Sequence, residues 1–214
     1  MSRPSPKPDY WERATKALAK RDPVLRRLLS QYPDISLRRR ADAFTTLARA
    51  ITGQQISVKA AQTVWNRVLL VANARRNRLS ASAIIALDPP ALRGCGLSQR
   101  KTEYISDLAT KFVDGHIRPR RWHAMDDDAV IAELVAVKGI GRWTAEMFLM
   151  FNLLRPDVLP VDDIGLQRAV ALLYNDGKRL EISELRAIAE AWAPWRSVAT
   201  WYLWRRLDPI PVEY

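Results

Sequence analysis

Apolar side chains recur every three or four positions along most of this 214-residue chain, which is the spacing of amphipathic helices. No convincing alternation of apolar and polar residues, the pattern typical of a half-buried strand, interrupts it. The sequence therefore predicts an all-α protein of about ten helices without repeats. We expect helices within the ranges 10–20, 22–29, 42–52, 57–72, 80–87, 98–112, 126–137, 142–154, 163–174, 182–193 and 196–206.

Glycine and proline divide these segments. Gly53 interrupts one apolar pattern, and Leu92–Leu97 is expected to form a tight glycine turn. Residues 115–121 are expected to form a basic linker. The polar, proline-rich residues 1–9 are expected to be a flexible tail, which leaves residues 10–214 as one helical core.

Composition adds a strong positive charge to this picture. The chain has 34 lysines and arginines against 23 aspartates and glutamates, a net charge of +11. Such an excess favours a polyanionic partner. No apolar run is long enough to span a bilayer, and the N-terminus has no secretory apolar region. We therefore expect an intracellular protein without a membrane partner.

Few side chains are suited to metal or disulfide chemistry. Cys95 is the only cysteine, which excludes an internal disulfide and a four-cysteine zinc or iron–sulfur site. His116 and His123 have no cysteine or carboxylate companions at ligand spacing. We expect no metal site built from side chains.

A glycine hairpin joins two of the expected helices. Gly139 and Gly141 flank one residue, and glycine permits a positive φ and the close approach of another backbone. The following helix begins near Arg142, so its first amide N–H groups point outward and suit a phosphate. Lys138 and Arg142 add charge. Spacing alone also allows the alternative of a closely packed helix–helix turn.

Two carboxylates precede the next helix. Asp162 and Asp163 stand directly before an Ile-Gly-Leu segment. An aspartate at this place is typical of a helix N-cap, which accepts hydrogen bonds from the first amide groups. Taken alone, the pair indicates a cap and a solvated neighbour. A phosphate-binding hairpin upstream makes a catalytic carboxylate the competing interpretation.

Together, residues 137–148 (V-K-G-I-G-R-W-T-A-E-M-F) and 157–166 (D-V-L-P-V-D-D-I-G-L) resemble the catalytic module of the HhH-GPD DNA glycosylase superfamily. The resemblance implies two helical lobes with a cleft between them and a helix-hairpin-helix motif at about 128–154. It also implies that Asp163 is the catalytic aspartate. The implied contacts to the DNA backbone are Lys138, Gly139, Ile140, Gly141, Arg142 and Thr144.

One position of the motif separates hydrolases from lyases. Members that also cleave the strand carry a lysine two residues after the second hairpin glycine, where this chain has Trp143. Lys138 precedes the hairpin and does not match. The resemblance therefore implies a monofunctional glycosylase in which water is the nucleophile, with no lyase activity and no iron–sulfur cluster.

Within the superfamily, residues 22–206 resemble the AlkA-type 3-methyladenine DNA glycosylases, in a compact form without the N-terminal β domain. In the segment Ala50–Ser57, the resemblance implies that Gln54 faces the lesion pocket and that Gln55 enters the gap in the duplex as a wedge. Relatives hold a monovalent cation on hairpin carbonyls, here near Val137 and Ile140. The other implied sites are the base pocket, with Trp143, Trp204 and Met147, and a second backbone contact at Gly94 and Gly96.

These observations predict an enzyme that flips out alkylated purines of the 3-methyladenine and 7-methylguanine class and hydrolyses the N-glycosidic bond. Double-stranded DNA with alkylated bases is the expected partner of a monomer in the cytoplasm or nucleoid. No cofactor is expected beyond a Na or K ion. The alternatives are a non-catalytic protein that binds alkylated or distorted DNA, and a mismatch or uracil glycosylase of the same superfamily.

Overall fold

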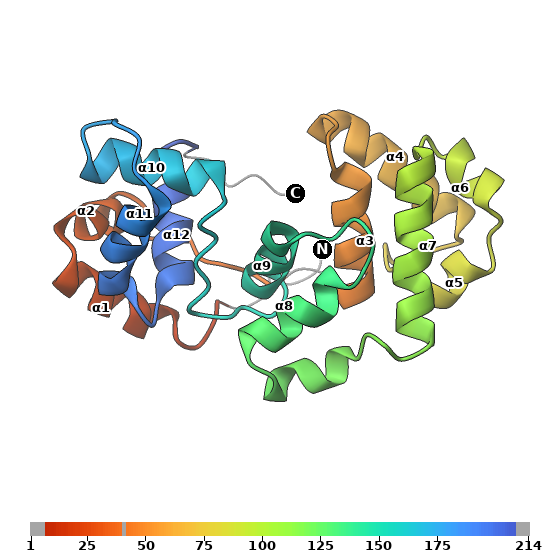
Figure 1. The fold of residues 1–214 in the computed structure, drawn as a ribbon, viewed down its shortest axis with the longest axis horizontal. Helices are drawn as coiled ribbons and strands as arrows, with labels where there is room; N and C mark the ends of the chain where they lie inside the picture. The colour runs from red at the N-terminus through yellow and green to blue at the C-terminus, as the bar shows by residue number, and fades with distance from the viewer. Residues whose placement is uncertain (1–6, 40–41, 209–214) are drawn as a thin grey trace. The chain divides into compact units, whose positions relative to one another are not determined.

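The computed structural model describes residues 7–39 and 42–208. These residues form twelve α-helices and two short 3-10 helices, and their only β pairing is an isolated bridge between Arg75 and Arg78 (Figure 1). The predicted all-α class is thus confirmed. Most of the predicted tail, residues 1–6, lies outside the described residues, as do the last positions of the predicted core, 209–214.

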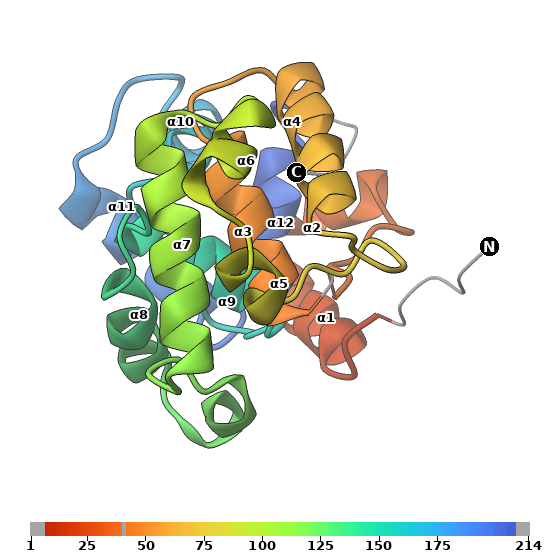
Figure 2. The same cartoon turned by 90° about the vertical axis from the view of Figure 1, so that its right-hand side faces the viewer.

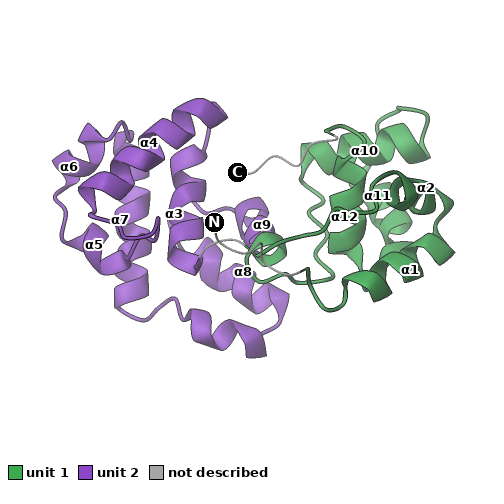
Figure 3. Cartoon of the chain, turned by 180° about the vertical axis from the view of Figure 1, so that it is seen from behind, with its two compact units in different colours: residues 1–39, 149–213 green, residues 40–148, 214 purple. Residues whose placement is uncertain are grey.

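The chain divides into two compact units (Figure 3). Unit 1 takes the residues up to Arg39 and those from Leu149 onward. Its central helices bury apolar side chains such as Leu18, Leu25 and Val198. The helices of unit 1 are α1 (Trp11–Arg21), α2 (Pro23–Gln31), α10 (Ile164–Tyr174), α11 (Ile182–Ala189), η2 (Glu190–Trp192) and α12 (Arg196–Trp204).

Unit 2 takes residues 40–148. Its long helix α7 packs against α3, α5 and α6 (Figure 2). The boundary with unit 1 falls inside α9 (Arg142–Phe151). The other helices of unit 2 are α3 (Ala43–Gly53), α4 (Val58–Val71), α5 (Ala81–Ile85), α6 (Pro89–Gly94), α7 (Gln99–Val113), η1 (Pro119–Ala124) and α8 (Asp127–Val135).

Short polar side chains begin most of these helices. The carboxylate or hydroxyl accepts a hydrogen bond from an amide of the first turn, which has no partner within the helix. The N-cap residues that do so are Asp22, Asp42, Ser57, Ser80, Asp88, Ser98, Asp126 and Asp163.

Several predicted boundaries were wrong. Helix α6 was not predicted, and its last three residues fall in the predicted turn 92–97; Asp88 caps it, and Pro89 occupies its first position, where proline's missing N–H costs nothing. The predicted linker 115–121 contains the start of η1. Helix α9 ends at Phe151 and α12 at Trp204, two or three residues before the predicted ends.

The carboxylate of Asp22 is the polar centre of unit 1. It is 6% exposed, and its Oδ1 accepts from the backbone N–H groups of Val24 and Leu25. Its Oδ2 accepts from the Tyr174 hydroxyl at 2.7 Å and from Trp192 Nε1 at 3.0 Å. Burial and the bond to Asp22 raise the pKa of Tyr174. One buried side chain thus joins the start of α2 to α10 and η2.

In the described part of the chain, no helix combines the length and the apolar character needed to cross a membrane.

Replacing Asp22 with alanine is expected to lower the free energy of unfolding by about 3–5 kcal/mol, because the buried Trp192 N–H and the partly buried Tyr174 hydroxyl lose their acceptor along with the cap. Urea denaturation measures this change. Asp126→Ala is the matched control, since Asp126 also caps a nine-residue helix but is exposed. Its cap is worth about 1 kcal/mol. Equal losses in both variants would contradict the buried role of Asp22.

Candidate active site

The predicted catalytic carboxylate is fixed at the start of α10. Asp163 Oδ1 accepts from the Leu166 backbone N–H at 2.6 Å and from Trp204 Nε1 at 2.8 Å. A turn leads into the helix, with Asp163 N–H donating to the Pro160 carbonyl. Two N–H donors from different helices therefore orient the carboxylate, which remains partly exposed.

Gly165 makes room for this arrangement. A Cβ at Gly165 would lie 3.0 Å from Asp163 Oδ1 and 3.3 Å from Trp204 Cδ1. These distances are tighter than ordinary van der Waals contacts, so a side chain there would require Asp163 or Trp204 to shift by a few tenths of an ångström. The glycine two residues after the aspartate thus leaves room for the Asp163–Trp204 hydrogen bond.

Helix α12, which carries Trp204, is anchored at its first residue. The Arg196 guanidinium binds both carboxylate oxygens of Asp157, at 2.7 Å and 2.6 Å. Ser197 Oγ accepts from the Val158 N–H at 2.9 Å. Bidentate pairs of this kind fix orientation as well as distance. They hold α12 beside the segment that leads to Asp163.

The two neighbouring aspartates differ in their surroundings. Asp162 is exposed, and its side chain makes no hydrogen bond or ion pair with the described residues. Asp163 has the two fixed donors described above. Both interpretations of the pair, helix cap and candidate catalyst, therefore fall on Asp163.

Exposure separates the two predicted pocket tryptophans from the rest. Of the eight tryptophans in the chain, six are buried, Trp204 is partly exposed and Trp143 is 46% exposed. Trp204 stacks on Phe151 with ring centroids 6.0 Å apart and meets Trp201 edge-on. The indole of Trp204 is thus fixed both by packing against these two rings and by its hydrogen bond to Asp163.

Trp143 belongs to unit 2, on the first turns of α9. Met147 follows four residues later on the same helix face and is partly exposed, as is Thr144. The roles of Trp143, Met147 and Trp204 in a base pocket remain predictions.

The hairpin between α8 and α9 lies directly on α7. The Ile140 N–H donates to the Val137 carbonyl at 3.1 Å, and both side chains are buried. Gly139 has φ +80°, and a Cβ there would overlap the ring of Tyr104. Gly141 is different, because a Cβ there would meet nothing within 4 Å. The fold therefore requires the first glycine, and it leaves the space beside the second one open.

The two cationic side chains of the hairpin differ in their partners. Lys138 is exposed. Arg142 is held by two carboxylates, Glu146 at 3.0 Å and Asp128 at 3.3 Å. Lys138 is consequently the more mobile cation beside the hairpin.

Asp107 of α7 also holds the hairpin. Its Oδ2 accepts from the Lys138 backbone N–H at 2.9 Å, while its Oδ1 pairs with Lys111 at 2.6 Å. Burial alone would raise the pKa of Asp107, but the hydrogen bonds from Lys111 and Lys138 lower it below its ordinary value. Asp107 is thereby kept as a carboxylate under the turn.

The predicted wedge lies in the turn between α3 and α4. Gln55 is exposed and has φ +56°, a left-handed conformation that few side chains adopt. Gln54 Nε2 donates to the Gly139 carbonyl at 2.8 Å. Lys101 Nζ donates to the carbonyls of Thr52 and Gln54, and burial lowers the pKa of Lys101. Gln54 therefore contacts the hairpin, and its role in the pocket stays a prediction.

The second predicted backbone contact is the turn after α6. Gly94 ends that helix, and a Cβ there would meet nothing within 4 Å. Gly96 has φ +100°, and a Cβ there would lie 3.3 Å from Val64. Cys95 between them is buried. Contact of this turn with the DNA backbone stays a prediction.

Side-chain metal ligands do not cluster in the described chain, where no group of three or more histidines, cysteines, aspartates or glutamates is placed to hold an ion. The oxygens available at the hairpin are backbone carbonyls, including that of Val137, which accepts one hydrogen bond and keeps a second lone pair. Carbonyl oxygens suit Na or K ions.

Four residues of the site escaped sequence reasoning: Gly165, Lys101, Tyr104 and Asp107. Gly165 stands in the motif itself, so its spacing from Asp163 was a usable signal. The other three lie on α7, at positions 101, 104 and 107, a spacing that brings successive residues near one face. Their contacts with residues about 30 or 50 positions away left no local signal.

The chain shares sequence and fold with proteins of known family. The family model described as "HhH-GPD superfamily base excision DNA repair protein" matches residues 48–196. DNA-3-methyladenine glycosylase 1 of Schizosaccharomyces pombe is 33% identical over 182 residues, which cover 84% of this chain and 78% of that protein.

Solved structures agree with this match. A DNA-3-methyladenine glycosidase from Bacillus halodurans superposes with a TM-score of 0.84 at 34% identity, over 91% of this chain and 89% of that one. The S. pombe 3-methyladenine DNA glycosylase in complex with abasic DNA gives a TM-score of 0.76 at 28% identity, over 94% and 100% of the two chains. The chain therefore belongs to the HhH-GPD superfamily of base excision DNA repair proteins.

Proposed function

We propose that this protein is a monofunctional DNA glycosylase that removes alkylated purines, of the 3-methyladenine and 7-methylguanine class, by hydrolysis of the N-glycosidic bond. The geometry of Asp163 carries the proposal: a partly exposed carboxylate oriented by Leu166 N–H and Trp204 Nε1, in a chain of a base-excision superfamily. The 3-methyladenine glycosylases among its relatives support the substrate class.

Binding would begin at the hairpin. The first amide groups of α9 and the open space at Gly141 let a phosphate approach the backbone closely. These contacts are independent of base sequence, as a search for rare lesions requires. The damaged nucleotide would then rotate out of the stack, and Gln55 would fill the gap that it leaves.

Recognition of the lesion would depend on charge. Alkylation at N3 or N7 makes the purine cationic, and a cation over an indole face gains about 0.5–2 kcal/mol. Trp143 and Trp204 are the two tryptophans with exposed surface for such a contact. The positive charge also weakens the glycosidic bond, so the base leaves as a neutral purine.

In the chemical step, the bond between C1′ and the purine nitrogen breaks and its electron pair goes to the base. Negative charge on Asp163 would stabilise the oxocarbenium-like sugar, as carboxylates do in glycoside hydrolysis. Asp163 would also orient a water, whose oxygen bonds to C1′ while its proton passes to the carboxylate and then to solvent. The already cationic base needs no strong general acid.

The remaining expectations follow from this function. We propose that the protein acts as a monomer on double-stranded DNA containing alkylated bases, in the cytoplasm or nucleoid. Backbone carbonyls near Val137 and Ile140 would hold a Na or K ion, whose charge would add to the positive potential beside the bound phosphate.

Replacing Asp163 with asparagine is expected to lower single-turnover release of 7-methylguanine or 3-methyladenine by about 100-fold or more, since the negative charge is lost. Asparagine retains an oxygen that accepts from Leu166 and Trp204, so folding and duplex binding should persist. Free base is measured chromatographically from methylated DNA, with Asp162→Asn as the matched control.

Near-normal release by Asp163→Asn would contradict the catalytic assignment. Binding of methylated duplex by the wild type without any base release would favour a non-catalytic damage-binding protein. A panel that includes uracil and mismatched substrates decides between the alkylated purines and the alternative lesions.

Alanine substitutions of the two hairpin glycines are expected to have different effects. Gly141→Ala should change the melting temperature by no more than about 2 °C but weaken binding to undamaged duplex about tenfold, because its Cβ occupies the approach of the phosphate. Gly139→Ala should cost about 2–4 kcal/mol of stability through overlap with Tyr104 and a strained φ. Thermal unfolding and fluorescence anisotropy measure both. Wild-type duplex affinity in Gly141→Ala would argue against phosphate binding at the hairpin.

Borohydride reduction is expected to trap no covalent complex with lesion-containing or abasic DNA, because Trp143 stands where a lyase carries its amine. A bifunctional endonuclease serves as the positive control, and denaturing gels show any cross-linked band. A trapped complex that disappears in Lys138→Met would overturn the hydrolytic assignment and identify Lys138 as the nucleophile.

A further inference from the structure

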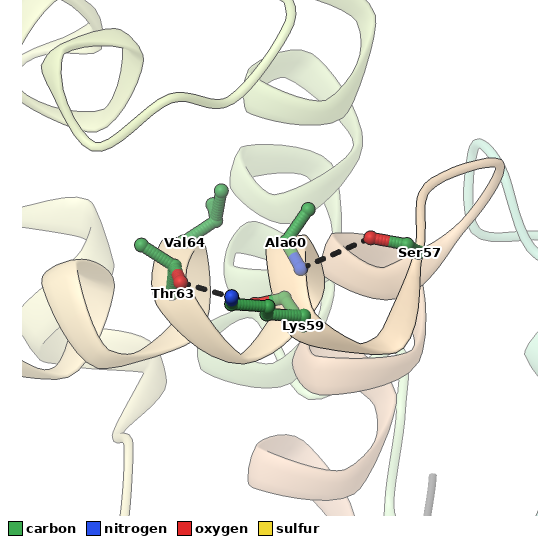
Figure 4. A pocket seen from close by; sticks show the side chains of 5 residues that line it. All are labelled: Ser57, Lys59, Ala60, Thr63 and Val64. Carbon is green, nitrogen blue, oxygen red and sulfur yellow. Dashed lines mark hydrogen bonds between the residues drawn. The ribbon is translucent and has the colours of Figure 1, made fainter.

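The turn between α3 and α4 projects an exposed tip from unit 2. Gln55 is exposed in a left-handed conformation, and the next side chain, Ile56, is 40% exposed. Ser57 then caps α4 by accepting from Ala60 N–H, beside an open depression on that helix (Figure 4). A non-glycine residue in this conformation is held there only if its surroundings fix it.

Lys101 supplies the fixing contact on one side of the tip. Its ammonium group donates to the Thr52 carbonyl at 2.9 Å and to the Gln54 carbonyl at 2.6 Å. These carbonyls lie at the C-terminal end of α3, where the helix dipole favours a positive charge. A lysine normally keeps its ammonium in water, so a partly buried ammonium bound to two carbonyls is an uncommon arrangement.

A second contact joins the same turn to the hairpin. The Gln54 side chain donates to the Gly139 carbonyl at 2.8 Å. Gly139 rests on Tyr104, one turn along α7 from Lys101, and Asp107 binds the Lys138 N–H from the following turn. One helix therefore supports both the exposed tip and the hairpin, and Gln54 connects the two directly.

We propose that Lys101 is a positioning residue for base flipping. By holding the carbonyls of Thr52 and Gln54, it keeps Gln55 and Ile56 presented at a fixed place relative to the hairpin. The tip then enters the duplex at a set distance from the gripped phosphate. This proposal rests on the proposed glycosylase function, because flipping is the step that it assigns to the tip.

Three α7 variants test the proposal. Lys101→Met keeps most of the side-chain volume and removes the ammonium, whereas Lys101→Arg retains donors for the two carbonyls. Arg100→Met is the matched control, because it removes a charge from the adjacent position, where the side chain is exposed and makes no hydrogen bond or ion pair with the described residues.

Each variant is assayed for single-turnover excision of a methylated purine from two duplexes. In one the lesion is paired, and in the other it lies opposite an abasic site, where leaving the stack is easier. We expect Lys101→Met to slow excision from the paired duplex by about 10–100-fold and from the unpaired duplex by less than about threefold. Lys101→Arg and Arg100→Met should remain near the wild type on both.

Amide hydrogen exchange of residues 52–57 in the free protein gives a readout that is independent of activity. We expect exchange to be about tenfold faster in Lys101→Met than in Arg100→Met. Equal excision defects on the two duplexes, or unchanged exchange, would overturn the positioning role. No base release by the wild type would instead refute the proposed function, and exchange would still decide whether Lys101 orders the tip.

Discussion

The backbone of the hairpin lies against the ring of Tyr104, closely enough that Gly139 has no room for a side chain. This contact places the hairpin on α7, and two hydrogen bonds hold it there. Asp107 binds the amide of the preceding residue, Lys138, while the Gln54 side chain donates to the Gly139 carbonyl from the turn between α3 and α4. Because interior contacts at this density tolerate little displacement, the first glycine fixes where the amide groups of α9 point. The second glycine, with open space around it, is then available to a ligand.

Two N-cap aspartates of unit 1 show how one local arrangement serves two purposes. Asp22 and Asp163 each accept from the amide groups of a helix start and from a tryptophan indole N–H. Asp22 is buried, and both of its oxygens are used within the fold. Asp163 is oriented through Oδ1 while part of its surface stays exposed. The same cap that begins a helix therefore becomes a candidate catalyst when burial is incomplete, which is why the cap and catalytic interpretations of Asp163 are compatible.

Local signals made the fold and part of the site predictable. The 3.6-residue period predicted the helices, and the predicted ranges that begin at Ser57 and Ser98 start on the observed N-caps, because period and cap both depend on neighbours within one turn. The motif also indicated Asp163. The contact of Lys101 with Thr52 and Gln54 could not be predicted, since it joins residues 49 and 47 positions apart. Helix α6 was missed for a different reason: its two prolines suggested a stop, although proline is well suited to a helix's first turn.

Net charge is a poor guide to how this surface would hold DNA. The chain has a formal net charge of +11, but some of its cations already have partners within the protein. Arg142 lies between two carboxylates, and Lys101 is bound to carbonyl oxygens. Near the hairpin, Lys138 is the mobile cation. In the proposed function, the stronger grip would therefore come from the oriented amide groups at the start of α9, which suit any phosphate whatever its base. In the proposed function, selectivity would then arise elsewhere, at the exposed indole of Trp143 and the partly exposed indole of Trp204, where a cationic base would be favoured over a neutral one. Such a separation would let the hairpin bind every nucleotide alike, while the indole surfaces would favour only the few bases that carry a positive charge.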